Sequence, residues 1–568
     1  MDNKHYASVL EDVGALLQIK GANRFRVRAF ENAARTISRL SESLDSYVEE
    51  DRVEEIDGIG ESIAEDLRQI HKTGTCKARE SLLEELDPGL LDIMKIQGLG
   101  PKRIKKIYEE LGIATIDALR QAAEAGEVSN LSGLGAKTEQ SILDEIDRLS
   151  KDSGRTPLPA AQRTADALKD RVADLPAAER VEIAGSLRRG RETIGDIDIL
   201  VATEDPEAVV EDFLDHREIN DVLARGTKKT SVRTSDGQQV DLRLVKPEIF
   251  GSALHYFTGS KEHHVQLRTR AKRQGLKISE YGVFEQGEDE PIASKTEEDV
   301  FDALGLDYIP PELREAAGEI EAAEEGSLPT LIEADDVRCD IHMHTTETDG
   351  SASIRQMGEA ARELGHDSIA ITDHSQAVTV ANGMTPDRFQ SHMDAIAEAN
   401  ETIDGIELLA GIEVDILKDG SLDMDHDLLA EADWVVGSIH SHFNLEPKAM
   451  TDRLLTALET GLLDAMGHPT GRILGGRDGY RFDYDAILEA ALEHEVAMEI
   501  NGSAGRLDLN AEMARTARAR QVKLVLGSDA HSTRGLGEIR YALQQARRAW
   551  LEADDVLNSW SPDELRDW

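Results

Sequence analysis

The spacing of hydrophobic positions divides the 568-residue chain into three regions. Up to about residue 150, apolar residues recur every three or four positions, as at Val9, Val13, Leu16 and Leu17, which predicts amphipathic helices. Short apolar runs typical of strands follow, and they are Val181–Ala184, Ile197–Ala202 and Val240–Val245. From about residue 336 onward, apolar runs alternate with amphipathic helices, which predicts a parallel sheet or barrel of βα units.

One glycine-rich turn occurs three times in the helical region. Its copies are Ile-Asp-Gly-Ile-Gly at 56–60, Ile-Gln-Gly-Leu-Gly at 96–100 and Leu-Ser-Gly-Leu-Gly at 131–135. Glycine permits positive φ, and the helix after each turn exposes backbone N–H groups that can bind a phosphate. One copy is typical of an ordinary helix cap, whereas three predict helix-hairpin-helix contacts to the DNA backbone. The candidate DNA-binding residues are Gly58, Gly60, Gly98, Gly100, Lys102, Gly133 and Gly135.

Paired carboxylates mark the middle region. Asp196 and Asp198 lie in a predicted strand two positions apart, so their side chains project from the same face. Two carboxylates on one face repel each other unless they share cations, and oxygen ligands with space for a triphosphate favour Mg²⁺. Asp241, in another predicted strand, adds a third carboxylate, and three such groups can hold two ions. The preceding turn, Gly185–Gly190, is a candidate phosphate-binding loop.

The C-terminal region carries histidines and acids at the ends of its apolar runs. Asp340–His344 is expected to form a strand that places His342 and His344 on one face. Ligands at successive strand C-termini converge at the mouth of a TIM-like barrel. The candidate metal ligands are His342, His344, Asp349, His374, Glu413, His440, His468, Asp529 and His531. Six imidazoles and three carboxylates favour Mn²⁺ or Zn²⁺ over Mg²⁺. The histidines interpreted as surface or core residues are His392, His426 and His494.

The charge balance is strongly acidic. The chain has 111 acidic and 64 basic residues, of which 21 are Lys and 43 Arg, and its formal net charge is −47 at pH 7. Nucleic-acid binding usually requires a basic surface, so either no polyanion is bound or the surface is adapted to molar salt, which screens charge within ~3 Å. Scarce lysine and widespread acids favour salt adaptation. Local basic clusters then remain to contact DNA, at residues 24–28, 102–106, 188–189 and 268–273.

Cysteine use and the lack of long apolar runs indicate the cellular compartment of the protein. Cys76 and Cys339 are too few for a disulfide framework and fit a reducing environment. No apolar run approaches the ~18 residues of a membrane span, and the N-terminal residues lack a signal-peptide pattern. We therefore expect a cytoplasmic, nucleoid-associated protein without a membrane partner.

The motifs of the middle region resemble those of family X DNA polymerases. They are Gly-Ser-Leu-Arg-Arg-Gly at 185–190, Gly-Asp-Ile-Asp at 195–198, Val-Asp-Leu-Arg at 240–243 and Tyr-Phe-Thr-Gly-Ser at 256–260. The resemblance covers residues 1–315 and implies an α+β nucleotidyltransferase palm with a thumb. It implies that Asp196, Asp198 and Asp241 are catalytic ligands of two Mg²⁺ ions, with Asp241 as the base near the primer 3′-hydroxyl. The implied nucleotide-binding residues are Ser186, Arg189, Gly195, Tyr256, Phe257, Gly259 and Arg268.

Three positions depart from the family pattern. His264 stands where relatives often have Asn, and Ile194 replaces a polar residue of the triphosphate site. Ala78 stands at the position that resembles the deoxyribose-phosphate lyase nucleophile, although a Schiff base needs an amine, such as that of the neighbouring Lys77. Fidelity and lyase activity are therefore left open.

Residues 336–568 resemble the PHP domain, a distorted (βα)₇ barrel that holds up to three metal ions. All nine ligand positions expected in that family have an acceptable residue here. The family implies hydrolysis of phosphodiesters or phosphomonoesters. Fused to a family X polymerase, the domain implies 3′→5′ exonuclease activity, with 3′-phosphatase or abasic-site endonuclease activity left open.

These resemblances imply a multidomain repair polymerase. The expected domains are a helix-hairpin-helix domain at 1–85, a helix-hairpin-helix fingers-type domain at 86–155, a palm at 156–248, a thumb at 249–315, a linker at 316–335 and a PHP barrel at 336–568. The expected function is short-gap filling from dNTPs on gapped or primer-template DNA, together with trimming of 3′ ends. Two alternatives are a PHP-type phosphatase or nuclease with a relic polymerase, and a DNA-binding scaffold for repair proteins.

Overall fold

In the computed structural model the chain forms two compact units, Met1–Gly154 and Arg155–Trp568. The structure describes residues 3–38, 44–49, 52–56, 58–87, 89–94, 96, 99–132, 134–135, 138–140, 142–143, 155–216 and 219–568. No helix in this described part combines the length and apolar content that a membrane crossing requires.

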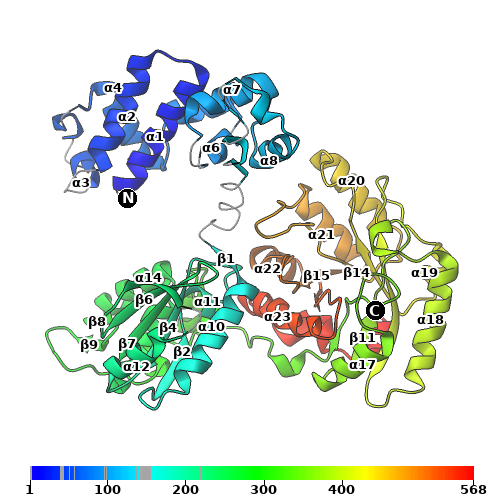
Figure 1. Cartoon of the computed structure of the whole chain (residues 1–568). Helices are drawn as coiled ribbons and strands as arrows, with labels where there is room; N and C mark the ends of the chain where they lie inside the picture. Colours follow the sequence, from blue (N-terminus) through cyan, green and yellow to red (C-terminus); the bar gives the residue numbers. More distant parts are fainter. Residues whose placement is uncertain are drawn as a thin grey trace. The chain divides into compact units, whose positions relative to one another are not determined.

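The first unit is helical, as the apolar spacing predicts (Figure 1). Its elements are α1 (Asn3–Lys20), α2 (Arg24–Ser38), α3 (Leu44–Glu49), η1 (Val53–Glu55), α4 (Glu61–Thr73), α5 (Lys77–Glu85), α6 (Leu90–Ile93), α7 (Pro101–Leu111), α8 (Ile116–Glu124) and η2 (Val128–Asn130). The apolar positions Val9, Val13, Leu16 and Leu17 are all buried on one face of α1. Packing of that face, rather than helix propensity alone, stabilises the unit.

The three glycine-rich turns have the same backbone hydrogen bond. The N–H of the fourth residue donates to the C=O of the first at 3.0 Å in each copy: Ile59 to Ile56, Leu99 to Ile96, and Leu134 to Leu131. Gly60 and Gly100 directly precede α4 and α7, and Gly58 has a φ of +85°. Lys102 is exposed in the first turn of α7. The C=O of Gly135 accepts a hydrogen bond from the N–H of Thr138, as at the start of a helix. The two other candidate glycines, Gly98 and Gly133, lie outside the described residues.

The predicted palm contains a five-stranded mixed sheet with the order β2-β4-β7-β6-β5. Its elements are β1 (Thr156–Pro157), α10 (Leu158–Ala173), β2 (Arg180–Ile183), α11 (Gly185–Arg188), β3 (Thr193–Ile194), β4 (Asp196–Ala202), α12 (Pro206–Leu214), β5 (Ile219–Ala224), β6 (Lys229–Thr234) and β7 (Gln239–Val245). The three expected strands correspond to β2, β4 and β7. The apolar pattern does not predict β5 and β6, because β5 is largely exposed and β6 is rich in polar residues.

The thumb region is mostly helical, with one hairpin, β8-β9. Its elements are η3 (Pro247–Ile249), α13 (Phe250–Thr258), α14 (Lys261–Arg273), β8 (Leu276–Ser279), β9 (Gly282–Glu285), α15 (Glu297–Ala303), η4 (Pro311–Leu313) and α16 (Glu319–Glu325). Residues 316–335, where a linker with some helix is expected, contain α16. Ile320, Ala323 and Leu331 of this segment pack into the same hydrophobic cluster as Phe301 of α15.

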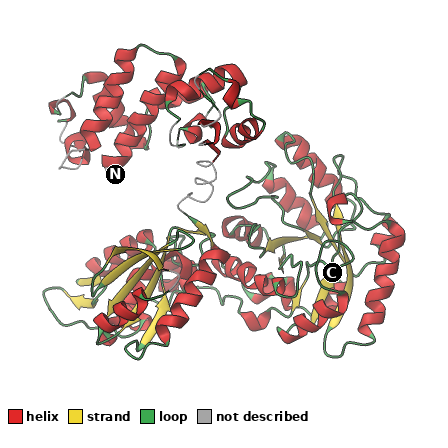
Figure 2. Ribbon diagram, viewed as in Figure 1, coloured by secondary structure: helices red, strands yellow, loops and turns green. Residues whose placement is uncertain are grey.

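The C-terminal region is a barrel of seven parallel strands in sequence order, with helices outside them (Figure 2). Its elements are η5 (Ala334–Asp336), β10 (Cys339–Asp340), α17 (Ile354–Glu363), β11 (Ser368–Ile371), η6 (Thr379–Ala381), α18 (Pro386–Asn400), β12 (Glu407–Asp415), α19 (His426–Leu429), β13 (Trp434–Ser438), α20 (Pro447–Leu458), β14 (Ala465–Met466), α21 (Tyr484–Glu493), β15 (Ala497–Asn501), α22 (Ala511–Ala519), β16 (Leu524–Gly527), η7 (Gly535–Glu538), α23 (Ile539–Arg548), η8 (Ala553–Asp555), η9 (Leu557–Ser559) and α24 (Pro562–Arg566).

The first strand of the barrel is shorter than the sequence predicted. The strand expected over Asp340–His344 is regular only to Asp340, where β10 ends. Beyond it, Met343 forms a single parallel bridge to Ala530, just past β16, which brings the first strand beside the last. The pairing is too short for a continuous strand, yet it nearly closes the barrel.

Barrel residues also complete the cores of the palm and thumb. Leu507 and Tyr541 belong to the hydrophobic cluster of the palm, and Trp550 belongs to that of the thumb. Arg547 on α23 donates to Glu312 of η4 at 2.8 Å. These shared contacts explain why residues 155–568 form one compact unit.

Candidate active sites

All nine C-terminal metal-ligand candidates converge at the mouth of the barrel. They form four overlapping groups in which the ligand atoms lie within 4.8 Å of one another: His344, Asp349, His374 and His531; His342, Glu413 and His468; His342, His344 and Asp529; and His374, Glu413 and His440. Most follow the carboxyl ends of the parallel strands, while Glu413 lies within β12 and Asp349 in a loop. The predicted convergence is therefore present in the structure.

Glu413 is the centre of this cluster. Its carboxylate lies 3.0 Å from Nε2 of His468 and 2.7 Å from Nδ1 of His374. The Nε2 atoms of His342 and His440 each approach it to 3.4 Å. Burial favours the neutral acid, but the surrounding histidines, His440 foremost, hold the pKa of Glu413 well below its usual range.

The donor atoms of the cluster fit divalent cations. Among the described residues, Nε2 of His342, both ring nitrogens of His344 and Nδ1 of His468 are buried without a hydrogen-bond partner. Buried polar atoms normally have a partner, and bound ions would supply one here. Burial lowers the pKa of His344 to about 4, so its imidazole is neutral, as a metal ligand must be.

Buried acids that the sequence pattern did not predict contact the imidazoles of the candidate ligands. Glu499 accepts a hydrogen bond from Nδ1 of His342 at 2.7 Å and another from the backbone N–H of His468. Asp415 lies 3.1 Å from Nδ1 of His440. Such acids commonly fix the ring and tautomer of a ligand histidine. The available sequence signal was a single acid inside an apolar strand, as in Ala-Met-Glu-Ile-Asn at 497–501.

His392, expected to be a surface or core residue, is buried and contacts a carboxylate. Its Nε2 lies 3.3 Å from Asp373, which also accepts hydrogen bonds from the N–H and hydroxyl of Thr345 at 2.8 and 2.6 Å. Thr348 donates to the same carboxylate. The network fixes the loop between His344 and Asp349.

The palm carboxylates lie on neighbouring strands. β4 and β7 are parallel, and Asp198 is directly opposite Asp241 in their register. Asp241 is almost fully buried, whereas Asp196 is exposed at the start of β4. Gly185, with a φ of +66°, lies so close that an added Cβ would be 2.6 Å from a carboxylate oxygen of Asp198. The glycine turn therefore lies directly beside the carboxylate of Asp198.

Two cationic side chains that the sequence pattern did not predict pair with these carboxylates. Nζ of Lys229 lies 2.5 Å from Asp241, and Nε of Arg243 lies 3.0 Å from Asp198. Burial raises the pKa of Asp198 to about 6 despite the opposing effect of Arg243. Burial also acts on Asp241, but hydrogen bonds led by that of Lys229 lower its pKa. Carboxylate oxygens that need positively charged partners are suitable ligands for Mg²⁺.

Five of the seven candidate nucleotide-binding residues form two groups, which are Tyr256, Phe257 and Arg268, and Arg189 with Gly259. The ring of Tyr256 stacks on His264 with centroids 5.4 Å apart, and the guanidinium of Arg268 lies 5.7 Å from the Tyr256 ring. Phe257 instead packs under the guanidinium of Arg243, at 4.1 Å. Tyr256 and Phe257 are adjacent residues of α13. Through them, the ring of Tyr256 is connected to Arg243, which pairs with Asp198.

The second group surrounds Arg189. Its guanidinium donates to Glu315 at 3.0 Å and to the backbone C=O of Thr258. A Cβ on Gly259 would lie 2.9 Å from this guanidinium. Ser186 lies half-buried in α11, and Gly195 is exposed just before β4. Arg189 and Gly259 therefore lie close together, but the guanidinium of Arg189 is bound to Glu315 and Thr258 of the protein itself.

Comparisons with known protein families identify each region. The families that match are DNA polymerase beta palm at residues 155–237, DNA polymerase beta thumb at 253–315, PHP domain at 340–503, helix-hairpin-helix domain at 1–76 and SAM-like helix-hairpin-helix tandem at 90–148.

Individual relatives match the whole chain or its barrel. The DNA polymerase/3′-5′ exonuclease PolX of Bacillus subtilis (strain 168) is 39% identical over 565 residues, which cover 99% of this chain and 98% of that protein. A probable phosphatase of Vibrio vulnificus (strain YJ016) is 27% identical over 251 residues, which cover 41% of this chain and 93% of the phosphatase. A probable phosphatase of Thermoanaerobacter sp. (strain X514) is 29% identical over 232 residues, or 39% and 89% of the two chains. The chain therefore belongs to the family X DNA polymerases that carry helix-hairpin-helix domains and a C-terminal PHP domain.

Proposed function

We propose that this protein fills short gaps in DNA during repair and removes nucleotides from 3′ ends, with one active site in the palm and one in the barrel. The observation that carries the proposal is the pairing of Asp198 with Asp241 beside the Gly185 turn. It occurs in a chain that is similar over its full length to a DNA polymerase/3′-5′ exonuclease. The substrates are dNTPs and gapped or primer-template DNA.

In the palm, Asp196, Asp198 and Asp241 would hold two Mg²⁺ ions. When bound, the ions supply charge stabilisation for the transferred phosphoryl group. Asp241, whose lowered pKa keeps it ionised, accepts the proton of the primer 3′-hydroxyl. Lys229 and Arg243 balance the carboxylate charge from the protein side.

The incoming nucleotide lies between the two groups around α13. Ser186 and Gly195 bind the triphosphate, and Arg189 joins them by exchanging the carboxylate of Glu315 for phosphate oxygens. Tyr256, Phe257 and Gly259 bound the sugar pocket, and Arg268 contacts the template. These positions match the motifs of the family, which supports the proposed roles.

In the barrel, the nine converging ligands would hold up to three Mn²⁺ or Zn²⁺ ions. Mixed imidazole and carboxylate donors suit these metals, which supply charge stabilisation at a scissile phosphodiester when bound. Glu499 and Asp415 keep His342 and His440 oriented toward them. The product is a nucleoside monophosphate released from the 3′ end.

The helix-hairpin-helix turns bind the DNA backbone without reading its sequence. The helix N-termini that follow Gly60 and Gly100, with Lys102 at the second, suit phosphates. The acidic surface is an adaptation to molar potassium salt, and the site of action is the nucleoid in the cytoplasm.

One experiment tests the function. Purified protein at high potassium is given gapped DNA with Mg²⁺ or Mn²⁺, with and without dNTPs. Extension with dNTPs and shortening without them are the expected results. DNA binding without turnover would instead support a scaffold, and hydrolysis confined to small phosphate esters would support a phosphatase with a relic polymerase.

A further inference from the structure

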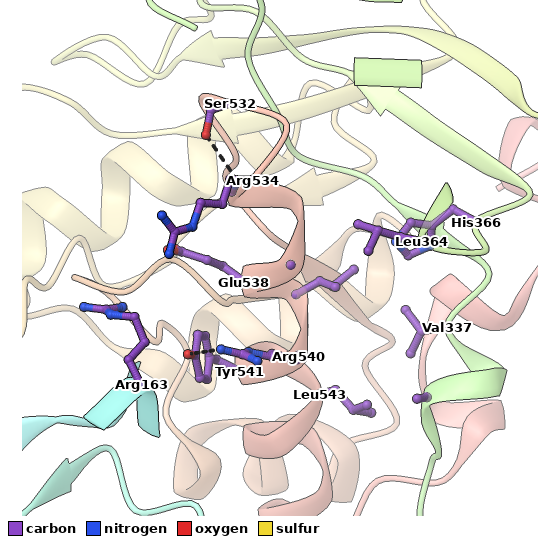
Figure 3. A pocket seen from close by; sticks show the side chains of 14 residues that line it. Arg163, Val337, Leu364, His366, Ser532, Arg534, Glu538, Arg540, Tyr541 and Leu543 are labelled. Carbon is purple, nitrogen blue, oxygen red and sulfur yellow. Dashed lines mark hydrogen bonds between the residues drawn. The ribbon is translucent and has the colours of Figure 1, made fainter. Parts of the chain in front are cut away.

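Helix α23 belongs to the barrel but also contacts the palm. It packs on β15 and β16, and its Tyr541 is part of the palm core. Tyr541 and Arg163 of α10 line one cavity of about 780 Å³, in which Arg540 donates to the Tyr541 hydroxyl at 2.7 Å (Figure 3). The last turn of α23 lies against the turn that begins at Gly185.

Two side chains of that last turn hold two consecutive carbonyls of the palm. Nε2 of Gln545 donates to the C=O of Gly190 at 2.9 Å, and Arg548 donates to the C=O of Arg189 at 2.8 Å. Gln545 is fully buried, and a Cβ on Gly190 would lie 2.5 Å from Gln544. The helix and the turn are therefore in close contact, and loss of the Gln545 hydrogen bond would leave a buried polar group unsatisfied.

Each of these peptide groups is also held from its other side. The N–H of Gly190 donates to the C=O of Leu187 at 2.9 Å, and the N–H of Arg191 donates to the C=O of Ser186 at 3.0 Å. The carbonyls point to α23 while the amides close the turn onto itself. Gln545 and Arg548 thus fix the orientation of the turn that presents Ser186.

Arg548 acts on Glu315 as well. Glu315 lies 3.0 Å from Arg189, 3.4 Å from Arg191 and 3.3 Å from Arg548. If Arg189 turns toward a triphosphate, Arg548 and Arg191 still neutralise the half-buried carboxylate that it leaves. Without Arg548, release of Arg189 would leave Glu315 with one partner, the exposed Arg191. Arg189 would then stay paired with Glu315 more often and bind the nucleotide less often.

We propose that α23 of the barrel positions the nucleotide site of the polymerase, through Gln545 and Arg548. The proposal rests on the proposed polymerase function and extends it: the barrel supplies part of the support for dNTP binding, although its own metal ligands take no part in polymerisation. Gln545 and Arg548 are positioning residues, because they act through the turn and Glu315.

The test is steady-state gap filling by the full-length protein, with dTTP as the varied substrate opposite a template dA. Arg548→Ala and Gln545→Leu are each expected to raise the KM for dTTP about tenfold, with a smaller change in kcat, because one buried hydrogen bond to the turn is lost. Arg548→Lys keeps a donor and a charge and should recover part of the affinity. Release of mononucleotides from 3′ ends should remain at the wild-type rate in all three variants.

Arg520→Ala is the matched control, because Arg520 pairs with Asp485 within the barrel at 2.7 Å. Its KM for dTTP should equal that of the wild type. A wild-type KM in both Arg548→Ala and Gln545→Leu would overturn the proposal, as would equal losses of extension and exonuclease activity, which indicate a general folding defect. Lack of extension by the wild-type protein would instead contradict the polymerase function itself.

Discussion

The guanidinium of Arg188 donates to both carboxylate oxygens of Glu297, at 2.9 and 2.6 Å. Arg314 approaches the same carboxylate at 2.6 Å, and Arg188 also donates to the hydroxyl of Thr258 at 2.7 Å. Burial opposes ionisation of Glu297, but Arg314 and Arg188 together lower its pKa to about 2. This buried network joins the α11 turn of the palm to α15 of the thumb.

The network predicts a loss of stability in acid. The folded-state pKa of Glu297, about 2, is below its ordinary value of 4.5, so its contribution is fully present above about pH 4.5 and is lost as the pH falls toward 2. A shift of this size corresponds to ~3 kcal/mol. Glu297→Gln should therefore lower the free energy of unfolding at pH 7, and the difference from wild type should shrink between pH 5 and pH 2.

The measurement is denaturant unfolding of both proteins across that pH range at constant high salt. Glu298→Gln changes an exposed neighbour and should leave the unfolding free energy unchanged. An undiminished difference between Glu297→Gln and wild type at pH 2 would contradict the role given to this carboxylate.

Primer extension should depend on the palm carboxylates. Asp241→Ala removes a proposed metal ligand and base, and extension on gapped DNA should fall by a factor of about 10³ or more. Release of mononucleotides from 3′ ends should continue. Asp236→Ala, an exposed acid in the preceding loop, serves as the control. Wild-type-like extension by Asp241→Ala would refute the assignment.

Exonuclease activity should depend on the barrel. His344→Ala removes a buried imidazole shared by two of the ligand groups, so 3′ trimming should fall by orders of magnitude while gap filling continues. The assay omits pyrophosphate and scores released monophosphates, because the palm site can shorten primers by pyrophosphorolysis. His426→Ala, at an exposed histidine, should behave as wild type. Normal trimming by His344→Ala would exclude the barrel as the nuclease.

Metal affinity of the barrel should depend on Glu499. Glu499→Gln keeps the size of the side chain but removes the charge that orients His342, and affinity for Mn²⁺ or Zn²⁺ should fall 10- to 100-fold. Metal retained after dialysis against graded chelator concentrations measures this directly. Glu493→Gln, at the end of α21, is the control. Equal retention by both variants would show that the contact does not support the metals.

The acidic surface predicts dependence on salt. With a net charge of −47, self-repulsion destabilises the compact state at low ionic strength, whereas molar KCl screens it. Circular dichroism and gap filling should persist in molar KCl and decline when the salt is dialysed away. Full structure in low salt, with activity lost between 50 and 200 mM as for common phosphate contacts, would contradict the salt adaptation.

Local rules predicted from the sequence which candidate ligands lie together. Alternation along a strand puts Asp196 and Asp198 on one face, and successive parallel strands bring residues such as His374 and His468 to one mouth. Both rules need only the chain's own periodicity and the order of its elements. The polar strand β6, which carries Lys229, gave no such signal, because its stability comes from pairing with β7 rather than from an apolar pattern.

The tertiary structure decided which residues contact those candidate ligands. Glu499 reaches His342 across 157 positions, and Arg548 reaches Arg189 across 359. No periodic pattern encodes such pairs, because they depend on how helices and strands pack against one another after they form. The sequence alone therefore determined the carboxylates and imidazoles of both sites, while packing determined that a barrel helix holds the turn of the palm.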